Sequence, residues 1–210
     1  MRRWPDPIRP LPKESRPMFR FILVFLALLP FLSACVSEPA SDTPFAPGSP
    51  AVLSVKQPGL QIPPGTRFAW LPGAREYHAS ERLRGQDINR LIEAAIGRSL
   101  ARRQLVLQPE AAGARYLLAW VAALEGDLDD ETIMRRFGIV PGINSAAGDR
   151  RVEKGTLILY AVDVRNGRRV WRSAMQTLVT LNMDAELRRQ RIEAAVEAMF
   201  ATLPVARQGK

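Results

Sequence analysis

One uninterrupted apolar run limits what this chain can fold into. Residues 116–124 read YLLAWVAAL and carry no charge. A strand with one solvated face alternates apolar and polar residues, whereas a strand covered on both faces is apolar throughout. So short a run could also belong to a buried helix, but a clearer helical pattern already occupies residues 87–103. The run therefore predicts a central strand in a sheet that is covered on both faces.

Two amphipathic helices are available to cover that sheet. Apolar residues recur at helical spacing over residues 88–100, with Asp87 as the expected N-cap. The same spacing recurs over residues 192–203, with Asp184 near its start and Pro204 after its end. Each pattern predicts a helix with one apolar face.

A β-hairpin is predicted late in the chain. Residues 155–164 and 168–181 are rich in β-forming residues and flank the tripeptide Arg-Asn-Gly at 165–167. Asn-Gly favours a type I′ turn, because both central residues of that turn need positive φ. Earlier in the chain, residues 66–71 (TRFAWL) predict a strand that ends at the Pro-Gly of residues 72–73.

Weaker patterns complete the expected fold. Residues 104–107 and 52–55 could form short strands, the latter an edge strand that Pro58 soon stops, and residues 129–137 could form a short helix closed by Gly138. The expected class is α/β (α+β), with a single small sheet of about four to five strands. Two amphipathic helices pack on that sheet, in the order β-α-(β)-β-β-β-α.

The N-terminal region has the organisation of an export signal. Met18 is the expected true start, because residues 1–17 are proline-rich and the sequence then becomes a signal peptide with Arg20 as its charged part. The apolar run over residues 21–34 contains a proline and is shorter than the roughly 20 residues that span a membrane. Residues 1–34 are therefore expected to be removed.

The end of this signal resembles a bacterial lipobox. Residues 32–35 read Leu-Ser-Ala-Cys, the order of a branched apolar residue, two small residues and the only cysteine of the chain. The resemblance implies cleavage between Ala34 and Cys35 and acyl chains, palmitate among them, on Cys35. A chance cysteine after a plain signal peptide is the alternative. Val36 is not the Asp associated with inner-membrane retention, which favours the outer membrane, with the domain facing the periplasm.

The rest of the chain divides into a tether and a domain. Residues 35–64 hold the lipidated cysteine and a proline-rich tether, residues 65–204 the globular domain, and residues 205–210 a tail. Without residues 1–35, 24 basic and 19 acidic residues remain, a net charge of +5. This mild charge, export from the cytoplasm and the absence of zinc-finger or RNP patterns exclude nucleic acid as the expected partner.

No catalytic constellation is recognisable in the sequence. His78 is the only histidine, and Glu76, Ser80 and Glu81 are neighbours in sequence only. A catalytic histidine needs a nucleophile and an orienting carboxylate, and no G-x-S-x-G motif or second cysteine is present. We therefore expect a surface histidine in a loop and no enzymatic activity.

Neither a metal nor another cofactor is expected. Asp127, Asp129, Asp130 and Glu131 form an acidic cluster of the kind that hard cations bind. The glycine and the glutamate of an EF-hand loop are missing, however, and carboxylates in a first helical turn are expected from the helix dipole alone.

Aromatic and basic residues offer two further candidates. Three tryptophans in predicted strands could form a ligand platform, but packing against the helices is the preferred interpretation; they are Trp70, Trp120 and Trp171. A basic surface for anionic lipid or cell-wall polymer is the second candidate, formed at the hairpin by Arg165, Arg168, Arg169 and Arg172 and at the start of the last helix by Arg188, Arg189 and Arg191. Because 26 of the 30 basic residues are arginine, coding bias is the alternative explanation. Alternation would place Arg168, Val170 and Arg172 on one face of the strand and Arg169 with Trp171 on the other.

Four segments of the domain resemble a known family. They are RFAWLP at 67–72, DDETIMRRFGIVPG at 129–142, EKGTLILYAVDVRNGRRVWRSAMQ at 153–176 and ELRRQRIEAAVEAMFATLP at 186–204. Together they resemble the domain of unknown function 4136 family of bacterial lipoproteins. The resemblance implies an envelope location and an α+β fold, and it implies no particular activity.

Two functions are therefore carried forward. The first is a lipid-anchored envelope lipoprotein whose domain is a non-enzymatic binding or scaffolding module. Its expected partners are the membrane, through Cys35, and an envelope protein, a cell-wall polymer or lipopolysaccharide. The alternative is an envelope hydrolase or other enzyme with a carboxylate-based site. A deep carboxylate-lined pocket would favour the enzyme, and a filled core with an open sheet edge or a basic face would favour the binding module.

Overall fold

The computed structural model describes residues 50–78, 87–144 and 152–206. They form one six-stranded sheet and three helices, all inside the compact unit Phe45–Lys210. Because the sheet and everything packed on it lie inside this unit, the unit carries its own hydrophobic core. The expected signal region, with its cleavage position at Ala34 and the lipidated Cys35, lies outside the described residues.

The strands follow the order β1-β6-β5-β4-β2-β3 across the sheet. Across the sheet, the neighbouring pairs β1–β6, β6–β5 and β5–β4 are antiparallel. β2 is parallel to both of its neighbours, β4 and β3. The expected α+β class is confirmed. The sheet has six strands, because the short strands β1 and β3 add to its two edges. The elements are β1 (Ala51–Lys56), β2 (Arg67–His78), α2 (Ile88–Arg102), β3 (Val106–Gln108), β4 (Tyr116–Leu124), α3 (Asp130–Phe137), β5 (Val152–Asp163), β6 (Arg169–Thr180) and α4 (Ala185–Phe200).

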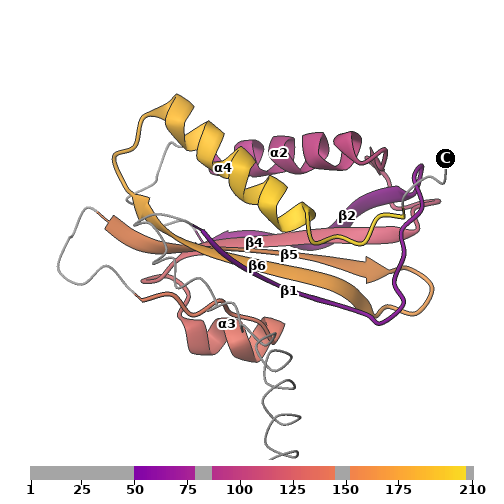
Figure 1. Ribbon diagram of the computed structural model, residues 1–210, viewed down its shortest axis with the longest axis horizontal. Coiled ribbons are helices and arrows are strands. Elements are labelled where there is room, and N and C mark those ends of the chain that lie inside the picture. Colours follow the sequence, from indigo (N-terminus) through magenta and orange to yellow (C-terminus); the bar gives the residue numbers. More distant parts are fainter. Residues whose placement is uncertain (1–49, 79–86, 145–151, 207–210) are drawn as a thin grey trace, which may run out of the picture. The chain divides into compact units, whose positions relative to one another are not determined.

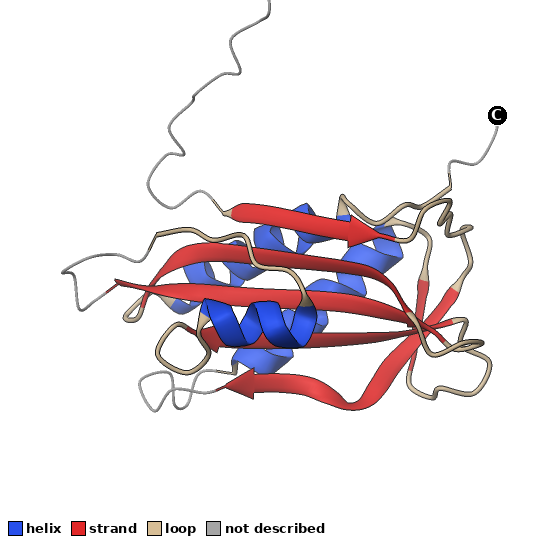
Figure 2. Cartoon of the chain, turned by 90° about the horizontal axis from the view of Figure 1, so that it is seen from below, coloured by secondary structure: helices blue, strands red, loops and turns tan. Residues whose placement is uncertain are grey.

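The sheet has a helical layer on each face. Helices α2 and α4, called the helix pair below, lie side by side on one face, and α3 lies on the other (Figure 1). Figure 2 shows the sheet from the side of α3, with the helix pair behind it. Within the described ranges, no helix is long and apolar enough to cross a membrane.

β4 is the central strand that its apolar run predicted. It lies between β5 and β2, and all of its residues except Leu117 are buried. Trp120 and Ala122 belong to the core beneath the helix pair, whereas Val121 and Ala123 belong to the core beneath α3. Strand alternation thus feeds two separate apolar cores from one uncharged run.

The helix pair begins where the sequence predicted. The Asp87 carboxylate accepts a hydrogen bond from the Arg90 N–H at 3.3 Å, and the Asp184 carboxylate accepts from Glu186 and Leu187. These side chains satisfy backbone donors that have no partner inside the helix. The N-cap prediction for Asp87 is confirmed, and Asp184, expected near the start of the last helix, is the N-cap of that helix.

The expected short helix after β4 is also confirmed. The Asp129 carboxylate accepts from the Thr132 N–H at 2.7 Å and begins α3, and Gly138 ends it with a φ of 65°. Ile133 and Phe137 of α3 pack into the second core. The helix therefore covers the face of the sheet that the helix pair leaves open.

β2 is longer than predicted. It continues past Pro72 to His78, and its register with β4 shifts between Trp70 and Arg75. Gly73 has a φ of 68° within this irregularity. A bulge leaves a ladder position unpaired, which is where a strand tolerates proline. The expected end of the strand at residues 72–73 is therefore wrong, and His78 is the last residue of a strand instead of a loop residue.

The β5–β6 hairpin is confirmed, but its predicted turn type is wrong. The Asp163 N–H donates to the Arg168 carbonyl at 2.9 Å and closes a loop over residues 164–167. Gly167 is the only residue of this loop with positive φ, whereas a type I′ turn needs two. The Asp163 carboxylate accepts from the Arg165 N–H at 2.8 Å and stabilises the longer loop.

A bulge in β6 changes which side chains share a face. The register with β5 shifts by one residue within Arg169–Trp171, and Val170 and Trp171 both pack beneath the helix pair. Arg169 therefore lies on the same face as Arg172, so the expected strict alternation is wrong at this point. The extra residue of the bulge is the physical reason.

β1 forms in the stretch expected to be a tether. Residues 51–56 pair antiparallel with β6, as the pattern of residues 52–55 allowed. Val52 faces the core beneath the helix pair, and Leu53 and Val55 remain exposed on the other face. One edge of the sheet is therefore an open strand.

Candidate functional site

One end of the core beneath the helix pair is tightly filled. Trp171 of β6 packs against Phe200 of α4, with ring centroids 5.5 Å apart. The Trp171 indole N–H donates to the Thr202 hydroxyl at 3.2 Å. Ile96 and Leu100 of α2 are fully buried in the same core. In Figure 1, α4 starts well above the sheet and descends toward it at this end.

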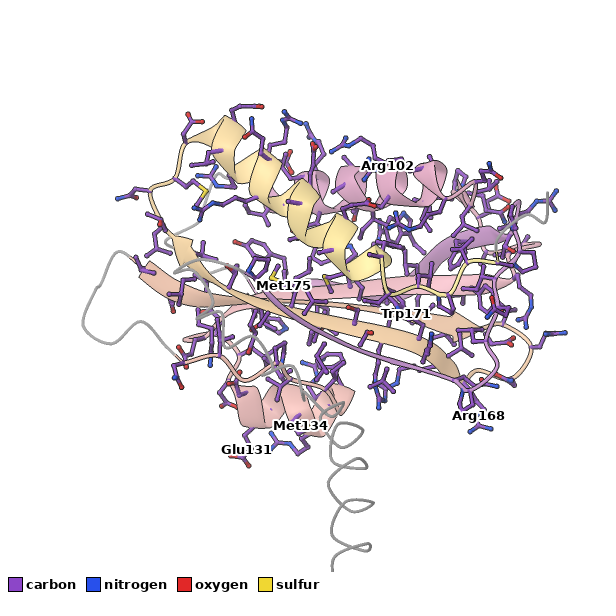
Figure 3. The ribbon with its side chains drawn as sticks, in the orientation of Figure 1. Arg102, Glu131, Met134, Arg168, Trp171 and Met175 are labelled. Carbon is purple, nitrogen blue, oxygen red and sulfur yellow. The ribbon has the colours of Figure 1, made fainter. Side chains whose placement is uncertain are left out.

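At the other end, the side chains leave a cavity of about 150 Å³. It lies beneath the N-terminal halves of α2 and α4, over the C-terminal ends of β2, β4 and β6 and the N-terminal end of β5. Met175 projects from β6 toward α4 beside this space (Figure 3). The helix pair therefore closes over the sheet at one end and leaves a pocket at the other.

The wall of the pocket is almost entirely apolar. Its inner part includes Ile92 from α2, Leu157 from β5 and Ile192 and Ala195 from α4. Gly155 lets the Val179 side chain pack closely against β5, because a Cβ there would come within 2.5 Å of that side chain. Among the described residues that line the pocket there is no Asp, Glu, His or Lys. The expected carboxylate-lined pocket of an enzyme is not the pocket that forms here.

Two arginines of α4 supply the only full charges among the described residues of the wall. Arg188 is half-buried and Arg191 is exposed. Arg188 donates through Nη2 to the Met183 carbonyl oxygen, which holds it beside another lining residue. Among the described residues, neither arginine forms a salt bridge with a carboxylate. The pocket therefore combines an apolar interior with positive charge that no acidic side chain of the described residues neutralises.

The carboxylates of α4 are engaged on its other side. Glu197 pairs with Arg102 and Arg103 of α2, and Glu193 pairs with Arg98 of α2 and with Arg189. Hydrogen bonds from Arg103 above all, and then from Arg102 and Ser99, lower the pKa of Glu197 to about 2. The pairs with Arg98, Arg102 and Arg103 join the two helices, and Arg188 and Arg191 remain on the side of the pocket.

Tyr77 adds a polar atom to the wall. Its hydroxyl oxygen is buried and has no hydrogen-bond partner within the described part of the chain. Burial raises the pKa of Tyr77, the charge of Asp127 adds to the rise, and Arg188 opposes it. The phenol is therefore protonated at neutral pH and is a hydrogen-bond donor. A buried polar group without a partner is uncommon in a folded protein.

A buried polar cluster lies on the opposite face of the same strands. The Gln176 amide donates to Asp130 at 2.6 Å and to Thr156 at 3.2 Å, and its oxygen accepts from the Gly142 and Ile143 N–H groups. Lys154 reaches Asp130 at 2.8 Å. These contacts fasten α3 and the chain that follows it to the sheet.

Lys154 keeps its charge inside this cluster. Burial would lower its pKa, but hydrogen bonds to Asp130 and Glu125 outweigh burial and raise the pKa of Lys154 above its ordinary value. Among the described residues, Lys154 pairs with two carboxylates of the α3 side, Glu125 and Asp130. The cluster is satisfied and structural.

The hairpin arginines of the predicted basic surface do not lie together. Arg165 and Arg168 are exposed at the turn. Arg169 lies over the Tyr160 ring at 5.9 Å and donates to the Arg136 carbonyl oxygen. Arg172 is half-buried beside Gly138. The structure thus splits the expected group into two exposed turn residues and two residues packed near α3.

The other candidates make local contacts within the domain. His78 Nε2 lies 3.4 Å from Glu76, which also accepts from Arg136 at 3.0 Å. Trp120 and Trp171 are buried beneath the helix pair, as the packing interpretation predicted, and Trp70 packs half-buried against the same core. Of the acidic cluster, Asp129 caps α3, Asp130 binds Lys154 and Glu131 pairs with Arg135. No group of three or more His, Cys, Asp and Glu in the described ranges could hold a metal ion.

The fold and the pocket define an α+β domain with an apolar, arginine-edged cavity. The chain belongs to the family described as Domain of unknown function (DUF4136), whose profile matches residues 60–205. The family resemblance noted in the sequence is thereby confirmed. A search of curated protein sequences found no match.

Several solved structures are similar to this chain. PelC from Paraburkholderia phytofirmans, crystallised as a dodecamer, shares 12% identity at a TM-score of 0.46, over 76% of this chain and all of that chain. A DUF4136 family protein from Bacteroides thetaiotaomicron shares 13% identity at a TM-score of 0.43, over 73% and 95%. Lipoprotein GNA1162 from Neisseria meningitidis shares 11% identity at a TM-score of 0.35, over 66% and 99%. At such scores these similarities support no inference about ligand, assembly or activity.

The pocket was missed by reasoning from the sequence. One signal pointed to it, since Arg188 and Arg191 share a helical stripe with Ile192 and Ala195 and so interrupt an otherwise apolar face. The sequence predicts a basic surface for the two arginines and places Ile192 and Ala195 on the apolar face of the last helix. What could not be anticipated is that α4 diverges from the sheet at this end, because the tilt of a helix depends on packing along its whole length.

Proposed function

We propose that this protein is a lipid-anchored envelope protein whose domain binds a small apolar ligand without catalysing a reaction. The pocket beneath the helix pair carries the proposal. It is apolar inside and offers neither a carboxylate nor a histidine among its described lining residues. Such a site suits binding, because general acid–base or nucleophilic chemistry needs positioned titratable groups.

The anchor is the second part of the proposal. Cys35 follows a signal that resembles a lipobox, and acyl chains on that cysteine would hold the domain at a bilayer. The outer membrane, with the domain facing the periplasm, is the proposed location because Val36 follows the cysteine. Labelled palmitate should be incorporated by the wild type and lost in Cys35→Ser; equal incorporation would contradict the anchor.

Methionine methyl groups give a direct test of binding. Met175 and Met183 line the pocket, whereas Met134 is exposed on α3 and Met199 is buried in the filled end. In residues 36–210 with ¹³C-labelled methionine methyls, octanol should shift the Met175 and Met183 resonances saturably at neutral pH. The Met134 and Met199 resonances should stay in place, because they lie away from the pocket.

A filled pocket is the control for that titration. Ala195→Leu adds carbon atoms to a buried position of α4 that faces the cavity. The variant should abolish the octanol shifts and keep a cooperative urea unfolding transition, which shows that the fold is intact. Shifts of equal size in wild type and Ala195→Leu, or no saturable shift in the wild type, would overturn the proposed function.

A further inference from the structure

Charge at the edge of the pocket restricts the kind of apolar ligand it accepts. Arg188 and Arg191 are the only fully charged residues of the described wall, and neither has a carboxylate partner in the described part of the chain. We infer that the pocket binds a single alkyl chain that ends in an anionic group. This inference rests on the proposed function, because it names the ligand class of the same pocket.

The size of the cavity sets the number of chains. Pockets for drug-sized ligands have volumes of about 300–1,000 Å³, and this cavity has about 150 Å³. An apolar cavity of about 150 Å³ accepts a molecule as small as benzene. The pocket therefore has room for part of one alkyl chain beside Leu157, Met175 and Ala195.

The arginines set the sign of the head group. A guanidinium stays charged at every physiological pH and presents several N–H donors in a planar fork that fits a carboxylate or a phosphate. Arg188 uses one of these groups on the Met183 carbonyl and keeps the others. Arg191 is exposed, so its head can reach an anion at the pocket edge. An ammonium head group would meet like charge at the same place.

Tyr77 supports the same assignment by an independent observation. Its hydroxyl is a buried donor without a partner among the described residues, and it belongs to the pocket wall near Arg188. An anionic oxygen is an acceptor with several lone pairs, which a hydroxyl and two guanidinium groups can share. An alcohol head group would leave most of these donors unused.

Three ligands of equal chain length test the inference. Octanoate, octanol and octylamine are titrated at pH 7 and low salt into residues 36–210, and the Met175 and Met183 methyl resonances report binding. Octanoate should bind about fivefold to tenfold more tightly than octanol, the range expected of charge-assisted hydrogen bonds that are partly open to solvent. Octylamine should bind most weakly. The advantage of octanoate should shrink as salt rises.

Matched variants assign the effect to the pocket arginines. Arg191→Gln and Arg188→Gln should each reduce octanoate binding several-fold and leave octanol binding unchanged. Arg168→Gln removes the same charge at the hairpin turn, at the opposite end of β6 from the pocket (Figure 3), and should change neither. Tyr77→Phe should weaken octanoate more than octanol.

A further arm separates the two natural sources of such a chain. Octanoate represents a free fatty acid, and octanoyl lysophosphatidic acid represents a single-chain phospholipid. Tighter binding of either than of octanol supports the inference, and the tighter of the two identifies the source. If neither octanoate nor octanoyl lysophosphatidic acid binds more tightly than octanol, the inference is overturned and the proposed function stands. If no ligand shifts Met175 or Met183, the proposed function itself fails.

Discussion

The two faces of the sheet differ at neighbouring positions of the same strands: one is covered through a buried polar cluster, and the other bears an apolar pocket. On β5, Lys154 and Thr156 face α3 and take part in a buried polar cluster, whereas Gly155 between them faces the pocket. On β6, Gln176 belongs to the polar cluster and Met175 to the pocket. Strand alternation therefore separates a hydrogen-bonded face from an apolar face within a few residues.

This difference shows which face is free to bind. Polar groups in a buried cluster demand particular partners, so the α3 face has one arrangement that satisfies Gln176 and Lys154. The apolar face has no such demand and tolerates a cavity, because a gap between apolar groups loses packing without leaving a polar group unpaired. The pocket accordingly lies on the side of the helix pair.

The polar face should be the more costly to disturb. Gln176→Met keeps the size of the side chain and removes hydrogen bonds to Asp130, Thr156 and two backbone N–H groups. We expect a loss of about 2 kcal/mol in the free energy of unfolding, because Thr156 is buried without its partner and the other groups reach water only partly. Urea unfolding at pH 7 measures it.

The neighbouring residue is the matched control. Met175→Leu changes an apolar side chain of similar volume at the pocket wall, and such exchanges usually cost less than about 1.5 kcal/mol. A loss for Met175→Leu as large as that for Gln176→Met would show that the two faces do not differ in the way described.

The local elements of this fold could be predicted because their signals are local. Asp87, Asp129 and Asp184 indicate helix starts, because an N-cap carboxylate accepts from a backbone N–H two or three residues later. The uncharged run of β4 indicates burial on both faces. The bulges in β2 and β6 could not be predicted. The shift in β6 comes from a single extra residue, which leaves no mark in composition, yet it places Arg169 on the other face.

The candidate site depended on relations that the sequence does not express. The stripe of Arg188, Ile192 and Ala195 was visible, but its meaning required knowing that the carboxylates of α4 are engaged with α2. Interpreting the stripe also required knowing that α4 diverges from the sheet at this end. Both are properties of pairs of distant elements, which periodicity within one helix cannot supply.

Ion pairs on the outside of the helix pair should contribute less to the free energy of unfolding than the buried polar cluster does. The dependence of stability on pH in acid measures their contribution. The pKa of Glu197 is lowered to about 2 from its ordinary 4.5, chiefly by the hydrogen bond from Arg103. A carboxyl whose pKa is lowered by folding stabilises the fold above its ordinary pKa, and this stabilisation is lost as the pH falls from about 4.5 toward 2. Because the Glu197 side chain is 41% exposed, solvent screens the pairs, and we expect them to contribute at most about 1 kcal/mol to the free energy of unfolding.

Glu197→Gln should therefore lower the urea midpoint at pH 7 slightly and flatten the dependence of that midpoint on pH between 5 and 2. The control is Glu131→Gln, whose side chain is 88% exposed. If Glu197→Gln keeps the full acid dependence of the wild type, these pairs do not help to hold α2 and α4 together.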